Sequence, residues 1–271
     1  MMKQLTCIGR FSPLTKKDIH SIRAHLPAYG CRINFILKED GVSKEERKEI
    51  ILLSLSGYDI CFDAPYQKEE VISDEQLDLG IQRKNLSELK KKAAHYCIAH
   101  CLYIEEIAQR TLSEKRFYHV KCVAELSAAL AVHYDIPYYK GYTAGLLHDI
   151  TKEWKKKKQA DYIARYYPER VSDHPKTYHQ LSAQKYVQLR YQVDDEEILA
   201  AIGNHVNGTD DRLLSRIVFC ADKIDDSRGF DNTEYKKLCF TDINKAYELI
   251  KNEQMRYLLK QLKKEGKKID G

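Results

Sequence analysis

Histidine and aspartate residues recur in the second half of the sequence in an order that suits metal chemistry. An adjacent pair, His148 and Asp149, follows a run of small residues and is flanked by leucine and isoleucine. Asp222 lies within the apolar run VFCADKI. A carboxylate in such a segment costs much free energy unless a partner neutralises it, and a bound cation does so. The candidate ligands are His119, His148, Asp149, His179, His205 and Asp222.

The alternative interpretation of each of these residues is structural. A single histidine on the apolar face of a helix is usually a core residue with hydrogen-bonded nitrogens. Four histidines and two aspartates on successive predicted helices favour a metal site instead, with ligands that converge from several helices. Imidazole and carboxylate ligands suit iron, manganese, zinc or cobalt better than magnesium or calcium.

Six ligands are more than one catalytic metal needs if it also holds a water molecule. Two metals that share Asp149 as a bridge would use all six. A water held by such metals ionises near neutral pH and attacks phosphorus, while the metals neutralise charge on the phosphoryl group. The ligand pattern therefore predicts a metal-dependent phosphohydrolase.

The elements that must position these residues change character near residue 104. Before it, apolar runs at 4–11, 32–38 and 59–65 predict strands. They alternate with helical segments, of which 43–57 is the clearest because Ser43 and Glu46 form a capping-box pattern ahead of an apolar stripe. This order predicts a small α/β layer with parallel pairing. The polar segment from Glu69 to Leu89 is predicted to be a loop or a loosely packed connection.

After residue 104 the apolar spacing is helical, and no strand signal of weight remains. Helices are predicted at 116–135, 140–154, 177–192, 196–206, 212–225 and 241–266. The predicted fold is therefore mainly α. An all-helical domain at 104–271 follows a small α/β domain at 1–103.

The composition fits a soluble, helix-rich protein. The 45 Lys and Arg residues are interleaved with 40 Asp and Glu residues, and the net charge of +5 is a weak indication of an anionic ligand. The eight cysteines form no Cys-x-x-Cys pair, so we expect free thiols in a reducing compartment. The first residues lack the apolar core of a signal peptide, and no segment is apolar enough to cross a bilayer. We therefore expect a cytoplasmic location and no membrane partner.

The ordered motifs resemble those of a known family. They are R-x-x-H at Arg116–His119, AGLLHDITK at Ala144–Lys152, His179, AIGNHVNG at Ala201–Gly208 and ADKIDDSR at Ala221–Arg228. A lone His-Asp pair is a weak signal, but the whole set in this order is specific. From about Ser113 to Ile243, the chain resembles the HD-domain symmetrical bis(5'-nucleosyl)-tetraphosphatases of the YqeK type.

This resemblance implies an all-helical HD domain that hydrolyses diadenosine tetraphosphate to two ADP. It also implies a site for two divalent transition metals, with iron expected and manganese, cobalt or zinc as alternatives. One metal would be held by His119, His148, Asp149 and Asp222, and the second by His179, His205 and the bridging Asp149. Lys152 and Arg228 would contact phosphate, although Arg228 has the alternative of pairing with Asp225.

The sequence departs from the family pattern after His179, where Gln180 replaces the usual small residue. This departure makes the second metal position the less secure one. His174, five residues before His179, is a possible decoy for that ligand, but Pro175 beside it indicates a loop. His133 ends a predicted helix and is interpreted as a surface residue.

The segment Gly9–His20 resembles a degenerate nucleotide-binding opening of nicotinate-nucleotide adenylyltransferases. That family has the pattern G-x-F-D-P-x-H-x-G-H, whereas this chain has Ser12, Thr15 and Asp18 in place of the Asp and the two His. Loss of both histidines argues against adenylyl transfer and predicts a shortened remnant. The alternative is an unrelated small α/β cap.

Three other functions stay open at the sequence level. An HD nucleotidase or phosphodiesterase with another nucleotide substrate would use the same ligands. In a nucleotide-binding regulatory protein, the first domain would bind a nucleotide and modulate the HD domain. Nucleic-acid binding rests on lysine-rich segments such as Lys155–Lys158, without an interleaved aromatic platform, and is not expected. A homodimer is compatible with the sequence.

Overall fold

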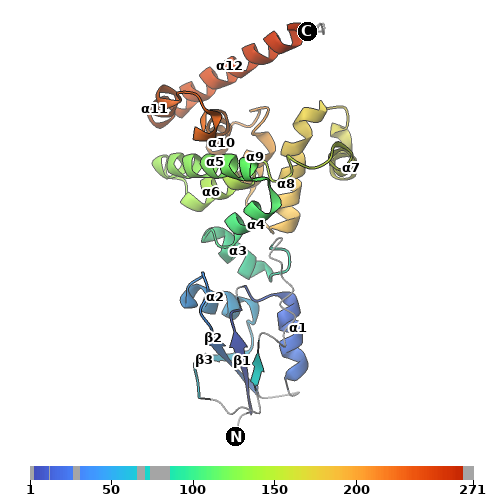
Figure 1. The fold of residues 1–271 in the computed structure, drawn as a ribbon, viewed down its shortest axis with the longest axis vertical. Helices are drawn as coiled ribbons and strands as arrows, with labels where there is room; N and C mark the ends of the chain where they lie inside the picture. Colours follow the sequence, from blue (N-terminus) through green and yellow to red (C-terminus); the bar gives the residue numbers. More distant parts are fainter. Residues whose placement is uncertain (1–2, 12, 27–30, 66–70, 74–85, 265–271) are drawn as a thin grey trace. The chain divides into compact units, whose positions relative to one another are not determined.

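The computed structural model describes residues 3–11, 13–26, 31–65, 71–73 and 86–264. The chain divides into two compact units. Unit 1 comprises Met1–Ile107 together with Arg190–Gln192, and unit 2 comprises Ala108–Leu189 and Val193–Gly271. Figure 1 shows strands only in the first unit, so the mainly helical fold with a small α/β part is confirmed.

Unit 1 is built on a parallel sheet with the strand order β3-β2-β1-β4. The strands are β1 (Lys3–Gly9), β2 (Cys31–Leu37), β3 (Asp59–Phe62) and β4 (Val71–Ser73). The three predicted strands and their parallel pairing are confirmed. The prediction of a loop from Glu69 to Leu89 was wrong at β4, which pairs with β1. Three residues are too few to show a period in the sequence, and backbone pairing defines this strand.

Two capping boxes start the helices that accompany the sheet. Ser43 caps α2 (Lys44–Ser54): its side chain accepts from Glu46 N, and the Glu46 carboxylate accepts from Ser43 N, as predicted. Thr15 and Asp18 form the same reciprocal pair at the start of α1 (Lys16–His25). The core between the helices and the sheet contains Phe11 and Phe35, whose rings meet edge to face at 5.2 Å. Helices α3 (Lys91–Ala99) and α4 (Ile104–Thr111) follow.

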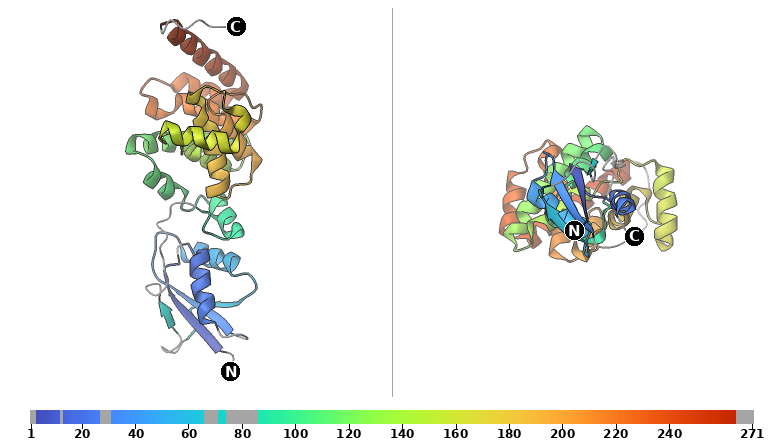
Figure 2. Two further views of the ribbon diagram at one scale, coloured as in Figure 1. Left: turned by 90° about the vertical axis from the view of Figure 1, so that its right-hand side faces the viewer. Right: turned by 90° about the horizontal axis from the view of Figure 1, so that it is seen from below.

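The described residues of unit 2 form helices joined by turns and loops, without a strand. Its helices are α5 (Glu114–His133), α6 (Tyr138–Leu147), α7 (Lys156–Tyr166), α8 (Tyr178–Arg190), α9 (Glu196–Asn204), α10 (Leu213–Ile224), α11 (Thr233–Thr241) and α12 (Ile243–Lys264). Short 3-10 turns lie at Pro168–Arg170, Pro175–Thr177 and Asp226–Arg228. Figure 2 shows the same helices from two other sides.

Two predicted helix boundaries were wrong. The helix predicted at 140–154 ends at Leu147, because the next residues form turns closed by hydrogen bonds from Lys152 N to Asp149 O and from Trp154 N to Thr151 O. The helix predicted at 241–266 begins only at Ile243, after α11 has ended. Helix α7 was not predicted, since its lysine-rich first turn hides a sparse apolar stripe.

Helices α5 and α6 pack unusually closely. A Cβ atom on Gly145 would lie 2.7 Å from Ala124 Cα, and one on Gly141 would lie 2.5 Å from Ser127 O. Only glycine fits at these two positions, one turn apart on α6. The pair fixes the end of α6, where the His-Asp motif follows. Among the described helices, none is both long and apolar enough to span a bilayer.

Candidate metal centre

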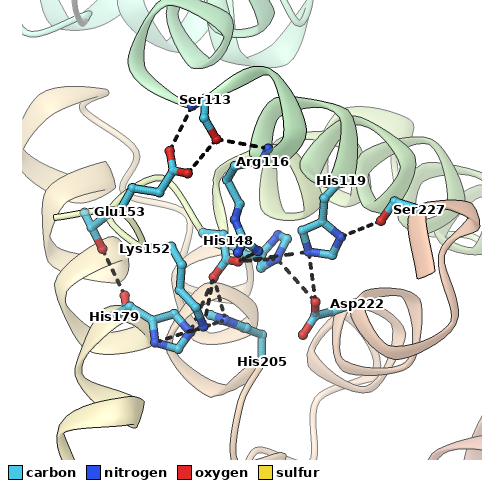
Figure 3. A network of polar contacts seen from close by, with 12 residues as sticks. Ser113, Arg116, His119, His148, Lys152, Glu153, His179, His205, Asp222 and Ser227 are labelled. Carbon is cyan, nitrogen blue, oxygen red and sulfur yellow. Dashed lines mark hydrogen bonds and ion pairs between the residues drawn. The ribbon is translucent and has the colours of Figure 1, made fainter. Parts of the chain in front are cut away.

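All six predicted ligands come together inside unit 2. His119 lies on α5, His148 and Asp149 follow α6, His179 lies in the first turn of α8, His205 follows α9, and Asp222 lies on α10. Each of these side chains is buried. Figure 3 shows His119, His148, His179, His205 and Asp222 directed toward one another from these separate segments.

One group of ligands surrounds the Oδ2 atom of Asp149. Nε2 of His119 lies 4.0 Å and Nε2 of His148 lies 3.7 Å from this oxygen. The same two nitrogens lie 3.2 and 3.6 Å from Asp222 Oδ1. These distances leave room for one ion among four donor atoms.

A second group surrounds the other oxygen of Asp149. Nε2 of His179 and Nε2 of His205 each lie 3.4 Å from Oδ1, and they lie 3.2 Å from each other. Neighbouring ligands of one metal with bonds of about 2.1 Å are separated by roughly 3.0–3.4 Å. The second group has this spacing. The two oxygens of Asp149 thus face two different sets of donors.

Hydrogen bonds to the outer ring nitrogens fix two of the histidine tautomers. His148 Nδ1 lies 2.6 Å from Gly145 O, and His205 Nδ1 lies 2.7 Å from Ile202 O. A carbonyl oxygen only accepts, so each Nδ1 carries the hydrogen and each Nε2 turns a lone pair toward the site. On His119, Nδ1 lies 3.0 Å from Ser227 Oγ and 3.3 Å from a buried Asp225 carboxylate oxygen.

The buried donor atoms need a cation. Among the described residues, His119 Nε2, His148 Nε2 and Asp149 Oδ1 are buried without a hydrogen-bond partner. An unsatisfied buried polar group is costly, and divalent metal bound at these two groups would satisfy the three atoms. The chemistry and spacing of these donors therefore fit a divalent metal centre.

Burial keeps the ligand histidines neutral on the second side of the site. It lowers the pKa of His179 to about 2, with help from the neighbouring His205. Burial also lowers the pKa of His205. Burial alone would raise the pKa of Asp149, but His148, His205 and Lys152 hold it well below its usual range. Neutral imidazoles beside an ionised carboxylate are the protonation states that metal ligation requires.

Both predicted phosphate-binding cations border the site. Lys152 Nζ lies 2.8 Å from His179 Nε2 and 3.9 Å from Asp149 Oδ1. Arg228 lies 2.7 Å from Asp222 Oδ1 and also pairs with Asp225 at 3.0 Å, as its alternative role predicted. Two further cations were missed by the sequence analysis. Arg116 Nη1 lies 2.8 Å from Asp149 Oδ2, and Lys223 Nζ lies 2.5 Å from Asp222 Oδ2.

The departure from the family pattern at Gln180 has a structural explanation. Its side chain is buried, and its Oε1 accepts from Val206 N and Asn207 N, directly after His205. Gln180 therefore ties the end of α9 to α8 and supports the second ligand group. His133 is exposed, as predicted, and His174 is exposed directly before the 3-10 turn at Pro175–Thr177.

Comparison with known proteins agrees with this site. The model of the HD domain matches residues 116–226. Residues 116–226 form an HD domain. The match begins at Arg116 and ends just beyond Asp222, so it contains all six candidate ligands of the HD domain.

Two curated relatives are similar to more than half of the chain. A "Probable nicotinate-nucleotide adenylyltransferase/Ap4A hydrolase" of Mycoplasma pneumoniae is 29% identical over 172 residues, which is 60% of this chain and 49% of that protein. A "Bis(5'-nucleosyl)-tetraphosphatase, symmetrical" of Staphylococcus aureus is 28% identical over 173 residues, 61% of this chain and 89% of that protein. The chain thus spans about half the length of the first relative. The resemblance predicted from the sequence is confirmed.

A solved structure supports the fold of the HD domain. A protein of Clostridium acetobutylicum described as a "predicted HD superfamily hydrolase involved in NAD metabolism" superposes with a TM-score of 0.54 at 26% identity. The match covers 61% of this chain and 88% of that protein.

Proposed function

We propose that this protein hydrolyses dinucleoside polyphosphates symmetrically, with diadenosine tetraphosphate giving two ADP. The observation that carries the proposal is the position of Asp149, whose two oxygens each face a separate set of buried donors. A carboxylate shared in this way suits two metals, and two-metal sites stabilise both the attacking and the leaving oxygen in phosphoryl chemistry. The names of the two relatives support the choice of substrate.

The proposed metal ligands are those predicted from the sequence. His119, His148, Asp149 and Asp222 would hold one divalent ion, and His179, His205 and Asp149 the second. When bound, the two ions would activate water and neutralise the phosphoryl oxygens. Iron is the expected metal, with manganese, cobalt or zinc as alternatives, because nitrogen and carboxylate donors suit all four.

The side chains around the ligands supply the remaining functions. Lys152 follows the His-Asp pair by one turn, and its ammonium group reaches the ligand atoms while the side chain stays partly exposed. It can therefore hold a phosphate on the leaving side as ADP departs. Arg228 lies across the site, beside Asp222, and offers a second phosphate contact. Burial of the ligands excludes competing hydrogen bonds from water.

The test is product analysis with purified, metal-analysed protein. Diadenosine tetraphosphate is incubated with the protein, and the nucleotides are separated by chromatography. ADP as the sole product supports the proposal. AMP together with ATP would mean asymmetric cleavage. Bound metal without turnover would favour the alternative, an HD nucleotidase or phosphodiesterase with another nucleotide.

For unit 1 we propose a degenerate remnant of a nucleotidyltransferase domain, with a domain boundary near residue 103. The positions of the two motif histidines hold Thr15 and Asp18, which cap α1, so neither can bind phosphate as histidine does. Ser12 lies outside the described residues. The strand order fits a nucleotide-binding α/β fold, so a regulatory nucleotide site is the alternative. A cytoplasmic location and a homodimer remain predictions.

A further inference from the structure

Four cations surround the two carboxylates of the metal centre, but they contact different oxygens. Arg116 contacts Asp149 Oδ2, and Arg228 contacts Asp222 Oδ1. These are the two oxygens that face His119 and His148. Lys223 contacts Asp222 Oδ2 instead, and Lys152 lies 3.9 Å from Asp149 Oδ1. Arg116 has no role in the function proposed so far, yet it holds an atom that the first metal needs.

Arg116 and a metal ion compete for the same oxygen. The guanidinium lies 2.8 Å from Asp149 Oδ2, a full ion pair with a buried carboxylate. A metal beside this oxygen would compete with the guanidinium for it and would repel the guanidinium as a like charge. Metal binding would therefore weaken the ion pair between Arg116 and Asp149.

The released guanidinium remains at the edge of the site. Arg116 lies in the first turn of α5, which is capped by Ser113. Ser113 N and Oγ donate to the Glu153 carboxylate at 2.8 and 2.6 Å, so this helix start is fastened to the turn that carries Lys152 (Figure 3). The Arg116 side chain is 31% exposed, which leaves it accessible to a ligand. A planar guanidinium suits two phosphate oxygens at once.

We propose that Arg116 is a phosphate-binding residue whose ion pair with Asp149 makes metal and polyphosphate bind cooperatively. The inference rests on the proposed function, and it adds a third phosphate contact and a coupling to it. Without metal, Arg116 is occupied by Asp149 and phosphate binds weakly. With metal, Arg116 is available, and a bound polyphosphate compensates the positive charge that the metals bring. Coupling of this kind is reciprocal, so phosphate also favours metal binding.

The experiment measures binding rather than turnover. The protein with all 271 residues is stripped of metal, and Mn²⁺ binding is measured by isothermal titration calorimetry. Inorganic phosphate is then titrated into the metal-free and the Mn²⁺-loaded protein. Arg116→Ala is compared with Lys115→Ala, which removes the same charge from the adjacent, exposed position of α5. Arg116→Lys keeps the charge but not the planar fork.

We expect wild-type protein to bind phosphate about tenfold more tightly when loaded with Mn²⁺. Arg116→Ala should show a smaller difference, because the metals still attract phosphate but the hydrogen bonds from the guanidinium to the charged group are lost. The same variant should bind Mn²⁺ roughly threefold or more tightly, because a competing like charge is gone. Lys115→Ala should behave as wild type, and Arg116→Lys should lie between.

The direction of the metal effect separates this role from a structural one. If Arg116 only holds Asp149 in place, Arg116→Ala will bind Mn²⁺ more weakly and leave the phosphate difference unchanged, and the inference is overturned. Equal phosphate affinity in metal-free and loaded wild type also overturns it. The proposed function is tested separately: it fails if metal-loaded protein forms no ADP from diadenosine tetraphosphate.

Discussion

At the scale of single residues, Asp149 is the centre of the site. Its Oδ2 faces His119 and His148, and its Oδ1 faces His179 and His205. No other described carboxylate in the cluster contacts both histidine pairs. The chemistry of both proposed metal positions therefore depends on one side chain.

The first prediction is that Asp149→Ala abolishes hydrolysis and removes both metals. The variant deletes the shared ligand and leaves only histidines at the second position, which hold a divalent ion poorly without a carboxylate. Metal analysis of the purified variant tests this. Asp226→Ala is the control, because Asp226 is exposed and pairs with Lys236 rather than with a candidate ligand. An Asp149→Ala protein that keeps both metals and its activity would contradict the assignment of Asp149 as the shared ligand.

Lys152 gives a second residue-scale prediction. Lys152→Ala should lower the turnover number by roughly 10²–10³-fold, the usual effect of losing one group that stabilises developing charge. The metal content of the variant should not change, because Lys152 is not one of the proposed metal ligands. Parallel metal analysis and steady-state kinetics check both statements, with Lys155→Ala as the exposed control. Loss of metal in Lys152→Ala would show that its role is to support the ligands.

Residue types and order were sufficient to predict the six side chains that gather in the buried cluster, and five of them lie within short motifs. The supporting residues could not be predicted in the same way. Arg116 contacts a carboxylate 33 residues further along the chain, and Ser227 contacts a histidine 108 residues away. Such contacts depend on how α5, α6 and α10 pack, which a motif does not contain. Gln180 appeared as a defect in the pattern, although it supports the second ligand group.

At the scale of elements, the close packing of α5 and α6 positions the His-Asp pair. Gly145 touches the Ala124 backbone, and its carbonyl oxygen also accepts from His148. One residue therefore serves both the contact between the helices and the orientation of a ligand.

The third prediction is that Gly145→Ala destabilises the HD domain and weakens metal binding. The added methyl group would lie 2.7 Å from Ala124 Cα, which forces the helices apart at a cost of about 1–3 kcal/mol. Denaturant unfolding and metal titration measure the two effects. Gly41→Ala is the matched control, since nothing lies within 4 Å of a Cβ there. Unchanged metal affinity in a destabilised Gly145→Ala protein would show that the helix contact does not orient His148.

Helices with a clear apolar stripe and a cap could be predicted, as α2 and its Ser43 cap show. The errors fall where local pattern and tertiary structure differ. Apolar residues continue past Leu147, but α6 ends there because the following residues form hydrogen-bonded turns at the site. Strand β4 exists through its pairing with β1, which no local pattern records.

At the scale of the whole molecule, the division into units separates the ligands from the rest of the chain. All six candidate ligands belong to unit 2. Unit 1 includes the short segment Arg190–Gln192, whose backbone and side chain are hydrogen-bonded to Leu86 and Leu89.

The fourth prediction is that a protein beginning at Ile104 keeps metal and hydrolytic activity. It loses the hydrogen bonds of the Arg190–Gln192 segment, so its free energy of unfolding should fall by about 3 kcal/mol or less. Circular dichroism, metal analysis and the ADP assay test this together. A truncated protein that folds and binds metal but does not hydrolyse the substrate would show that unit 1 takes part in catalysis.

The cap at the start of α1 has a consequence for the history of unit 1. Thr15 and Asp18 hold each other through three hydrogen bonds, and both side chains are buried. A histidine at either position breaks this reciprocal pair, at a cost of about 1 kcal/mol, without restoring a two-histidine motif. Under the proposal that unit 1 is a nucleotidyltransferase remnant, a return toward that motif by single substitutions would pass through a less stable protein with no compensating gain. The capping pair would then make the loss of the two histidines difficult to reverse.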